Sequence, residues 1–212
     1  MKKTLFISLL FLSLQSCSSL LLKTYGLKSI KPLSSENILK QGKKYKIPES
    51  DAFELDSTYY SFLKSLDTSR YKQVQKDHFQ PLQAIYYAKN GQMSSFHINC
   101  YCGGFPNLKW NRNGNFDTFL PKQQAPLDSV FTLVKQLSFI QPLSNQDVLD
   151  VTPFDYVVVV HWSRYMGRQS KRLIALVQKN ARLNKQDRIK IIYVNSDNAY
   201  VYEYARQSEK NP

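Results

Sequence analysis

Two cysteines separated by one residue are the side chains of this sequence with the clearest capacity for chemistry. Cys100 and Cys102 flank Tyr101 in a segment predicted as a strand. Residues two apart on a strand face the same side with Cα atoms roughly 6.6 Å apart, near the upper limit for a disulfide. A break at residues 103–104, both glycine, would permit the bond. The pair predicts two buried thiols or a structural disulfide, with a strained, reducible redox pair as the alternative.

The three histidines add little to this chemistry. His97 forms a His-x-x-Cys-x-Cys pattern with the two cysteines, yet on a regular strand its side chain faces the other way and no fourth ligand is evident. His161 has no Ser, Cys or paired carboxylate at a recognisable spacing to activate, which predicts a core or rim histidine. His78 gives no signal. We therefore expect neither a metal site nor a cofactor.

Cys17 follows a segment with the layout of a secretory signal. Lys2 and Lys3 precede an apolar region at residues 5–14, too short to span a bilayer that needs about 20 residues. Residues 14–17, Leu-Gln-Ser-Cys, resemble a bacterial lipobox, which implies a signal peptide over residues 1–16 and acylation of Cys17. An ordinary signal peptide with a chance cysteine and an uncleaved anchor are the alternatives.

The lipobox resemblance also implies where the protein works. Ser18 and Ser19 follow Cys17, a pattern similar to outer-membrane sorting in Gram-negative bacteria. We expect a lipoprotein anchored in a bacterial membrane, the outer rather than the inner, and facing the periplasm. No later apolar run approaches about 18 residues, so no further transmembrane helix is predicted.

The composition predicts a folded, basic domain. The 212 residues are 42% hydrophobic and 13% aromatic, which excludes whole-chain disorder. Seven glycines and three cysteines exclude collagen-like chains and disulfide scaffolds. The formal net charge is +13 and falls to +11 once Lys2 and Lys3 are removed with the signal. Outside the cytoplasm this charge favours anionic membrane surfaces and not nucleic acid.

The elements that position these residues follow from hydrophobic spacing and turn signals. A tether rich in lysine and serine, partly ordered near the globular part, is predicted for residues 17–50, and one compact domain for residues 51–212. Its first part, residues 51–150, reads as helix, hairpin and helix at 51–67, 82–102 and 127–139, with an Asn-Gly turn in the hairpin. Its second part, residues 151–212, reads as strand, helix, strand and short helix at 156–162, 170–184, 188–194 and 198–206.

Residues 156–197 resemble the front half of a thioredoxin-like domain. The strand that ends at Trp162 is similar to the central strand of that family. Residues 165–169, Tyr-Met-Gly-Arg-Gln, fall where the family carries Trp-Cys-Gly-Pro-Cys, and residues 194–197 match the end of its next strand. The resemblance spans about 42 of the 212 residues. It implies an α/β fold with a thioredoxin-like mixed sheet flanked by helices.

The predicted site departs from the chemistry of that family. Met166 and Gln169 replace the two cysteines, and Arg168 replaces the proline. Thioredoxin-type exchange needs a thiolate at the helix N-terminus and a second thiol to resolve the mixed disulfide, so we expect no redox activity here. With Trp162 and Gly167 these positions form a degenerate site. We expect the pocket around Trp162, Met166 and Arg168 to serve as a binding surface.

Only fifteen residues follow Asp197, too few for the rest of the thioredoxin-like fold. Residues 81–92 are similar to the family's proline, strand and Lys-Asn-Gly turn. This implies a circularly rearranged fold with one continuous sheet. An unrelated hairpin domain packed beside a half-fold is the alternative.

The helix predicted at residues 170–184 carries its cations on one side. Five cations lie opposite its apolar stripe, namely Arg168, Lys171, Arg172, Lys179 and Arg182. Besides the membrane reached through the N-terminal lipid, this side suits anionic lipid headgroups or an envelope protein. A plain solvated surface is the alternative.

The sequence leaves two functions open. The first is a cell-envelope lipoprotein with a redox-inactive thioredoxin-like fold and a non-catalytic role in binding or scaffolding. The alternative is a divergent thiol–disulfide oxidoreductase that uses Cys100 and Cys102 in place of the lost pair.

Overall fold

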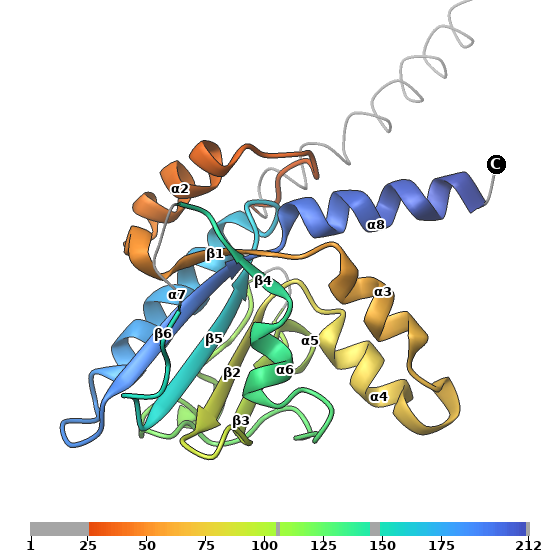
Figure 1. The fold of residues 1–212 in the computed structure, drawn as a ribbon. Coiled ribbons are helices and arrows are strands. Elements are labelled where there is room, and N and C mark those ends of the chain that lie inside the picture. Colours follow the sequence, from red (N-terminus) through yellow and green to blue (C-terminus); the bar gives the residue numbers. More distant parts are fainter. Residues whose placement is uncertain (1–25, 105–106, 145–148, 211–212) are drawn as a thin grey trace, which may run out of the picture.

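One mixed sheet runs through the protein (Figure 1). The computed structural model describes residues 26–104, 107–144 and 149–210. Within these ranges the sheet has six strands in the order β3-β2-β5-β6-β1-β4. The strands are β1 (Ala52–Leu55), β2 (Gln83–Ala88), β3 (Met93–Ile98), β4 (Ile140–Pro142), β5 (Tyr156–Trp162) and β6 (Ile189–Asn195). The neighbours β5, β6 and β1 are parallel, and the other pairings are antiparallel.

The strand–helix–strand unit predicted from the valine run is confirmed. In β5, Val158 and Val160 face one side of the sheet and Val157 and Val159 the other, and all four are buried. A strand buried on both faces needs no polar alternation, which is why the run is continuous. The helix α7 (Gly167–Ala181) then crosses over the sheet to β6, which pairs with β5 in parallel.

The predicted hairpin joins the same sheet. Residues 89–92 connect β2 to β3, and Gly91 has the positive φ of 76° that an Asn-Gly turn requires. Strand β2 then pairs antiparallel with β5 over its whole length, from Gln83 opposite His161 to Ala88 opposite Tyr156. The result is the continuous α/β mixed sheet that the rearranged thioredoxin-like prediction describes, with the hairpin ahead of the strand–helix–strand unit in the chain.

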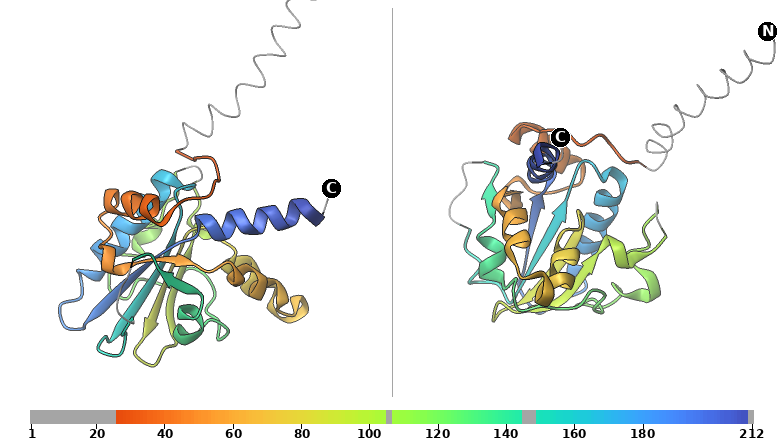
Figure 2. Two further views of the ribbon diagram at one scale, coloured as in Figure 1. Left: turned by 45° about the horizontal axis from the view of Figure 1, so that its top comes forward. Right: turned by 90° about the vertical axis from the view of Figure 1, so that its right-hand side faces the viewer.

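Helices cover both faces of the sheet (Figure 2). The core on one face is closed by α2 (Ser35–Lys44), by α7 and by the loop at 107–121. The core on the other face is closed by α3 (Thr58–Ser65), α4 (Thr68–His78), α6 (Leu133–Leu137) and α8 (Asp197–Lys210). A single helical turn, α5 (Asn99–Cys102), follows β3.

Residues 26–50, predicted as a tether with only partial order, instead belong to the folded domain. Ile38 on α2 is completely buried, and the Tyr45 ring makes an edge contact with Trp162 at 5.6 Å between centroids. Ser34 caps α2 through its hydroxyl, which accepts from the backbone N–H of Asn37. The globular domain therefore includes residues 26–50 as well as the predicted residues 51–212.

Two predicted helices are also corrected. Residues 51–67 contain strand β1 before helix α3, because Phe53 and Leu55 alternate with Glu54 beside β6. The helix predicted at 127–139 shrinks to α6. The Asp128 carboxylate accepts from the backbone N–H groups of Val130 and Phe131, which holds that segment in a turn until the chain becomes helical at Leu133.

Two histidines are buried as neutral rings on opposite faces of the sheet. On His161, Nε2 accepts from the Gln136 amide at 3.0 Å, and burial, with a contribution from His78, lowers its pKa to about 3. His97 packs against Phe116, and burial lowers its pKa to about 3 as well. Both rings therefore disfavour the charged form that the unfolded chain adopts below its ordinary pKa of 6.5.

The free energy of unfolding should fall as the pH is lowered from about 6.5 towards 3, because the unfolded chain binds protons that the folded one refuses. Each of the two histidines should cost about 2 kcal/mol by about pH 5. Urea unfolding of the His161→Gln variant should show a pH dependence weaker by about that amount than the parent. An identical pH dependence in the two proteins would contradict the neutral buried ring.

Candidate functional site

The buried carboxylate of Asp197 organises the edge where β5 and β6 end. Its Oδ2 accepts from the backbone N–H of Arg164 at 2.5 Å and from the Asn195 amide at 2.9 Å. Its Oδ1 accepts from the backbone N–H of Tyr165 at 3.1 Å. The side chain is almost wholly buried, and a buried carboxylate is tolerated where hydrogen bonds of this kind satisfy it. The turn after β5 is thereby fixed to the start of α8.

The turn into α7 is equally constrained. The Ser170 hydroxyl donates to the carbonyl of Ser163 at 2.6 Å and accepts from its N–H at 3.2 Å. The Ser163 hydroxyl in turn accepts from the N–H of Met166 at 3.1 Å. Gly167 opens the helix with a φ of +44°, a conformation that disfavours any side chain. This is the place where the resemblance located the degenerate thioredoxin-like site.

Residues 26–33, which we call the cover segment, lie across this turn. The N–H of Lys28 donates to the Tyr165 carbonyl at 2.9 Å, and the Arg164 guanidinium donates to the Ser29 carbonyl at 2.6 Å. At the other end, the Asn198 amide bonds both the N–H and the carbonyl of Leu33, each at 2.8 Å. The cover segment is thus attached at both of its ends to the turns that Asp197 holds together.

The cover segment and the core bury most of the predicted site. Trp162 and Gln169 are each 1% exposed and Met166 is 5% exposed, and Gly167 is also buried. Of these five positions only Arg168 is exposed, and its guanidinium donates to the Asn107 side chain at 3.1 Å. The prediction of an open binding surface around Trp162, Met166 and Arg168 is therefore wrong for the first two residues, because the chain's own N-terminal segment occupies the space above them.

Cys100 and Cys102 lie on the helical turn α5 and not on a strand. Strand β3 ends at Ile98, after which the Asn99 side chain accepts from the N–H of Leu82. Both thiols are free, Cys100 exposed and Cys102 buried. Cys102 donates to the Ile98 carbonyl at 3.2 Å.

The two thiols are poorly suited to disulfide exchange. Burial raises the pKa of Cys102 to about 12 and also raises the pKa of Cys100 above its ordinary value. Exchange proceeds through a thiolate that can reach its partner. The geometry therefore gives the oxidoreductase alternative no support.

His97 and His78 are buried on opposite faces of the sheet. His97 bonds Ser95 at 3.0 Å, and His78 bonds Asp128 at 2.8 Å inside the other core. In the described ranges no three His, Cys, Asp or Glu side chains gather as a metal would need. Cys17, predicted to be lipidated, and the signal peptide predicted for residues 1–16 lie outside the described residues.

None of the helices in the described part of the chain combines the length and the apolar character needed to cross a membrane.

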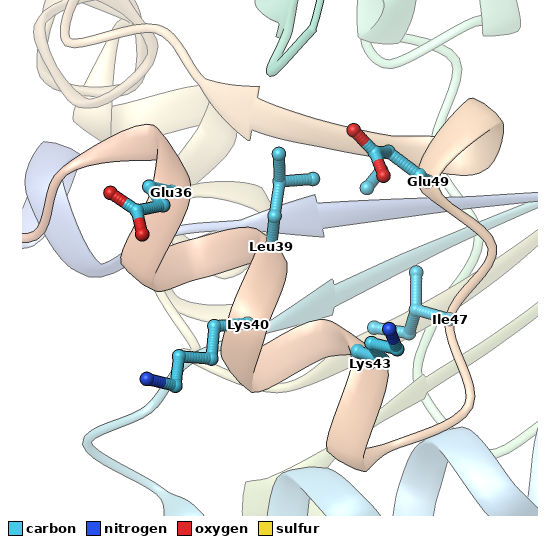
Figure 3. A pocket seen from close by; sticks show the side chains of 7 residues that line it. Glu36, Leu39, Lys40, Lys43, Ile47 and Glu49 are labelled. Atoms are coloured by element: carbon cyan, nitrogen blue, oxygen red, sulfur yellow. The ribbon is translucent and has the colours of Figure 1, made fainter.

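A first cavity lies beside α2 (Figure 3) and has a volume of about 570 Å³. Leu39 and Ile47 contribute apolar surface, and Figure 3 shows Leu39 between the carboxylates of Glu36 and Glu49. Lys40 and Lys43 also line it. Two acids and two bases balance one another, so this cavity does not select a ligand by charge.

A second hollow, which we call the basic groove, lies between the loop after α5 and the outer side of α7, with a volume of about 610 Å³. The five cations predicted on one side of α7 are all exposed. Two of them, Arg172 and Lys179, line the groove together with Lys109 and Arg112 from the loop. Sequence reasoning missed the loop cations because about 60 residues separate them from α7.

The fold and these sites define an α/β protein with a thioredoxin-like mixed sheet, a covered cysteine-free site and a basic groove. Comparison with known proteins found no matching family model, no matching curated protein and no matching solved structure.

Substituting Gly167 by Ala should detach the cover segment. A Cβ at this position would lie 2.1 Å from the Gly26 carbonyl oxygen, and its backbone φ is unfavourable for alanine. We expect a loss of about 2 kcal/mol or more in unfolding free energy, and faster trypsin cleavage after Lys28.

The matched control is Gly42→Ala in α2, where the nearest neighbour of the added Cβ is 3.6 Å away. This change should leave cleavage unaltered and stabilise the helix by up to about 1 kcal/mol. Wild-type protease resistance in Gly167→Ala would show that the contact with Gly26 is not needed to hold the cover segment.

Proposed function

We propose that this chain is a bacterial cell-envelope lipoprotein whose thioredoxin-like domain binds a partner and does not catalyse a reaction. Acyl chains on Cys17 would anchor it, with the domain facing the periplasm from the outer membrane. Several acyl chains suffice for stable anchoring, which one chain alone does not provide. Its partners would be the membrane itself and anionic headgroups or an envelope protein, and not nucleic acid.

The observation that carries this proposal is the covered site. Where a thioredoxin-like enzyme needs an exposed thiolate, this chain has the thioether of Met166 and the amide of Gln169. Neither group can ionise to a thiolate, and both are buried beside the turn that the cover segment crosses. A site closed by its own chain supports a structural role for this edge of the sheet, which leaves the exposed surfaces to interact with partners.

The cover segment also supports a position close to the membrane. It begins at Gly26, nine residues after the predicted lipid on Cys17. Nine extended residues reach at most roughly 30 Å. The acyl chains would therefore hold the edge of the sheet that carries Asp197 and the start of α7 within about that distance of the bilayer.

Substituting Cys17 by Ser should release the protein from the membrane, because no acyl chain can then be attached. Expressed in a Gram-negative host, the parent should sediment with membranes, and mass spectrometry of its N-terminus should find an acylated Cys17. The Cys17→Ser variant should lose both the modification and most of its resistance to extraction with salt.

Cys100→Ser is the matched control, since it removes an exposed thiol outside the signal and should leave membrane association intact. An unmodified Cys17 in a parent protein that keeps an intact N-terminus would refute the lipoprotein. A reversible redox cycle that requires both Cys100 and Cys102 would instead establish the oxidoreductase.

A further inference from the structure

The basic groove presents four cations on two separate elements. Lys109 and Arg112 come from the loop, and Arg172 and Lys179 from α7. In the described part of the chain none of the four forms an ion pair. No carboxylate lines the groove, and Asp117, the one acid of the loop at 107–121, accepts from the Asn111 amide instead. The groove therefore favours a ligand with negative charge.

The floor of the groove is apolar. Leu108 and Trp110 of the loop are 3% exposed and belong to the core on this face of the sheet. Leu176 of α7 packs against the same core and is half-buried. The combination of apolar floor and basic rim fits a ligand with an apolar part next to an anionic part.

The walls of the groove are preformed. The buried Asn180 of α7 donates to the carbonyls of Phe116 and Thr118 at 3.0 and 2.8 Å. Its own carbonyl accepts from the Tyr86 hydroxyl at 3.1 Å. At the start of the loop, the N–H of Lys109 donates to the Gly103 carbonyl at 3.2 Å. A groove held in this way binds its ligand without the entropic cost of ordering the loop.

The groove also lies near Gly26, which is nine residues along the chain from the predicted lipid on Cys17. A Cβ on Gly26 would lie 3.2 Å from the Cβ of Arg168, and Arg168 is one helical turn before Arg172. Arg168 also bonds Asn107 at the edge of the loop. A membrane held by acyl chains on Cys17 would therefore be within reach of the groove.

We propose that the basic groove binds an anionic phospholipid, with the phosphate on its cations and the first part of an acyl chain on Leu108, Trp110 and Leu176. This inference rests on the proposed membrane lipoprotein and names its ligand. A free phosphate would use the cations but not the floor. An acidic peptide would satisfy the charge, but the position of the groove beside the predicted anchor favours lipid.

The test measures lipid binding to the full chain in non-ionic detergent by native mass spectrometry. Phosphatidylglycerol should bind more tightly than phosphatidylcholine with the same acyl chains. Glycerol phosphate, which has no acyl chain, should bind far more weakly than phosphatidylglycerol. The variant Arg172→Glu/Lys179→Glu should bind phosphatidylglycerol at least about tenfold more weakly, because it reverses two of the four charges that would bind the phosphate.

The matched control is Lys72→Glu/Lys76→Glu on α4, which covers the opposite face of the sheet. It changes the net charge equally and, like the groove variant, places one glutamate in the last turn of a helix. Its phosphatidylglycerol affinity should stay within about twofold of the parent, and circular dichroism should show both variants folded.

Equal loss of affinity in the two double variants would overturn the groove as the site. Three outcomes would overturn an anionic phospholipid as the ligand. They are equal affinity for phosphatidylglycerol and phosphatidylcholine, equal affinity for glycerol phosphate and phosphatidylglycerol, and tighter binding of a polyglutamate peptide than of phosphatidylglycerol. Binding in detergent does not depend on acylation of Cys17. Failure of the groove and failure of the lipoprotein proposal are therefore told apart by this experiment and the Cys17→Ser fractionation.

Discussion

The buried carboxylate of Asp197 connects the parts of the protein from which its function follows. Its hydrogen bonds to the backbone of Arg164 and Tyr165 fix the turn after β5 at the start of α8. The same two residues bond the cover segment, through the Tyr165 carbonyl and the Arg164 guanidinium. The next residue, Asn198, holds the far end of that segment. A negative group at the first turn of a helix is also favoured by the helix dipole. One buried charge thus determines both the shape of this edge and what lies on it.

Because the cover segment closes this edge of the sheet, other surfaces of the fold are the ones open to partners. In a thioredoxin-like enzyme the start of the helix after the central strand must be open to substrate. Here Met166 and Gln169 are buried, and Gly167 lets the backbone of Gly26 approach too closely for any side chain. The exposed chemistry of α7 lies instead along its outer side, where Arg172 and Lys179 face the loop cations across an apolar floor. The proposed role in binding at a membrane follows from this shift.

The sequence predicts the centre of the fold better than its edges. The valine run of β5 and the Asn-Gly turn identify elements whose conformation is set locally, and both were predicted correctly. Residues 26–50 were predicted as a tether because their few apolar residues are separated by lysines and serines. Ile38 of α2 is nevertheless buried in the core that α7 also closes, a contact between segments far apart in the chain. Only the α7 side of the basic groove could be predicted from the sequence. The α7 cations share one helical face, which the spacing reveals. The loop cations lie beside them only because the Asn180 amide bonds the carbonyls of Phe116 and Thr118, more than 60 residues earlier in the chain.

The central claim is that the chain's own N-terminal segment closes the degenerate site. Hydrogen exchange of the full chain, resolved to single residues, tests it most directly at the backbone N–H groups of Lys28 and Leu33. Both donate hydrogen bonds, to the Tyr165 carbonyl and to the Asn198 side chain. The account predicts that both exchange much more slowly than an unfolded chain and that exchange at Lys28 accelerates in Gly167→Ala. Exchange of both groups at the rate of an unfolded chain in the parent protein would contradict it.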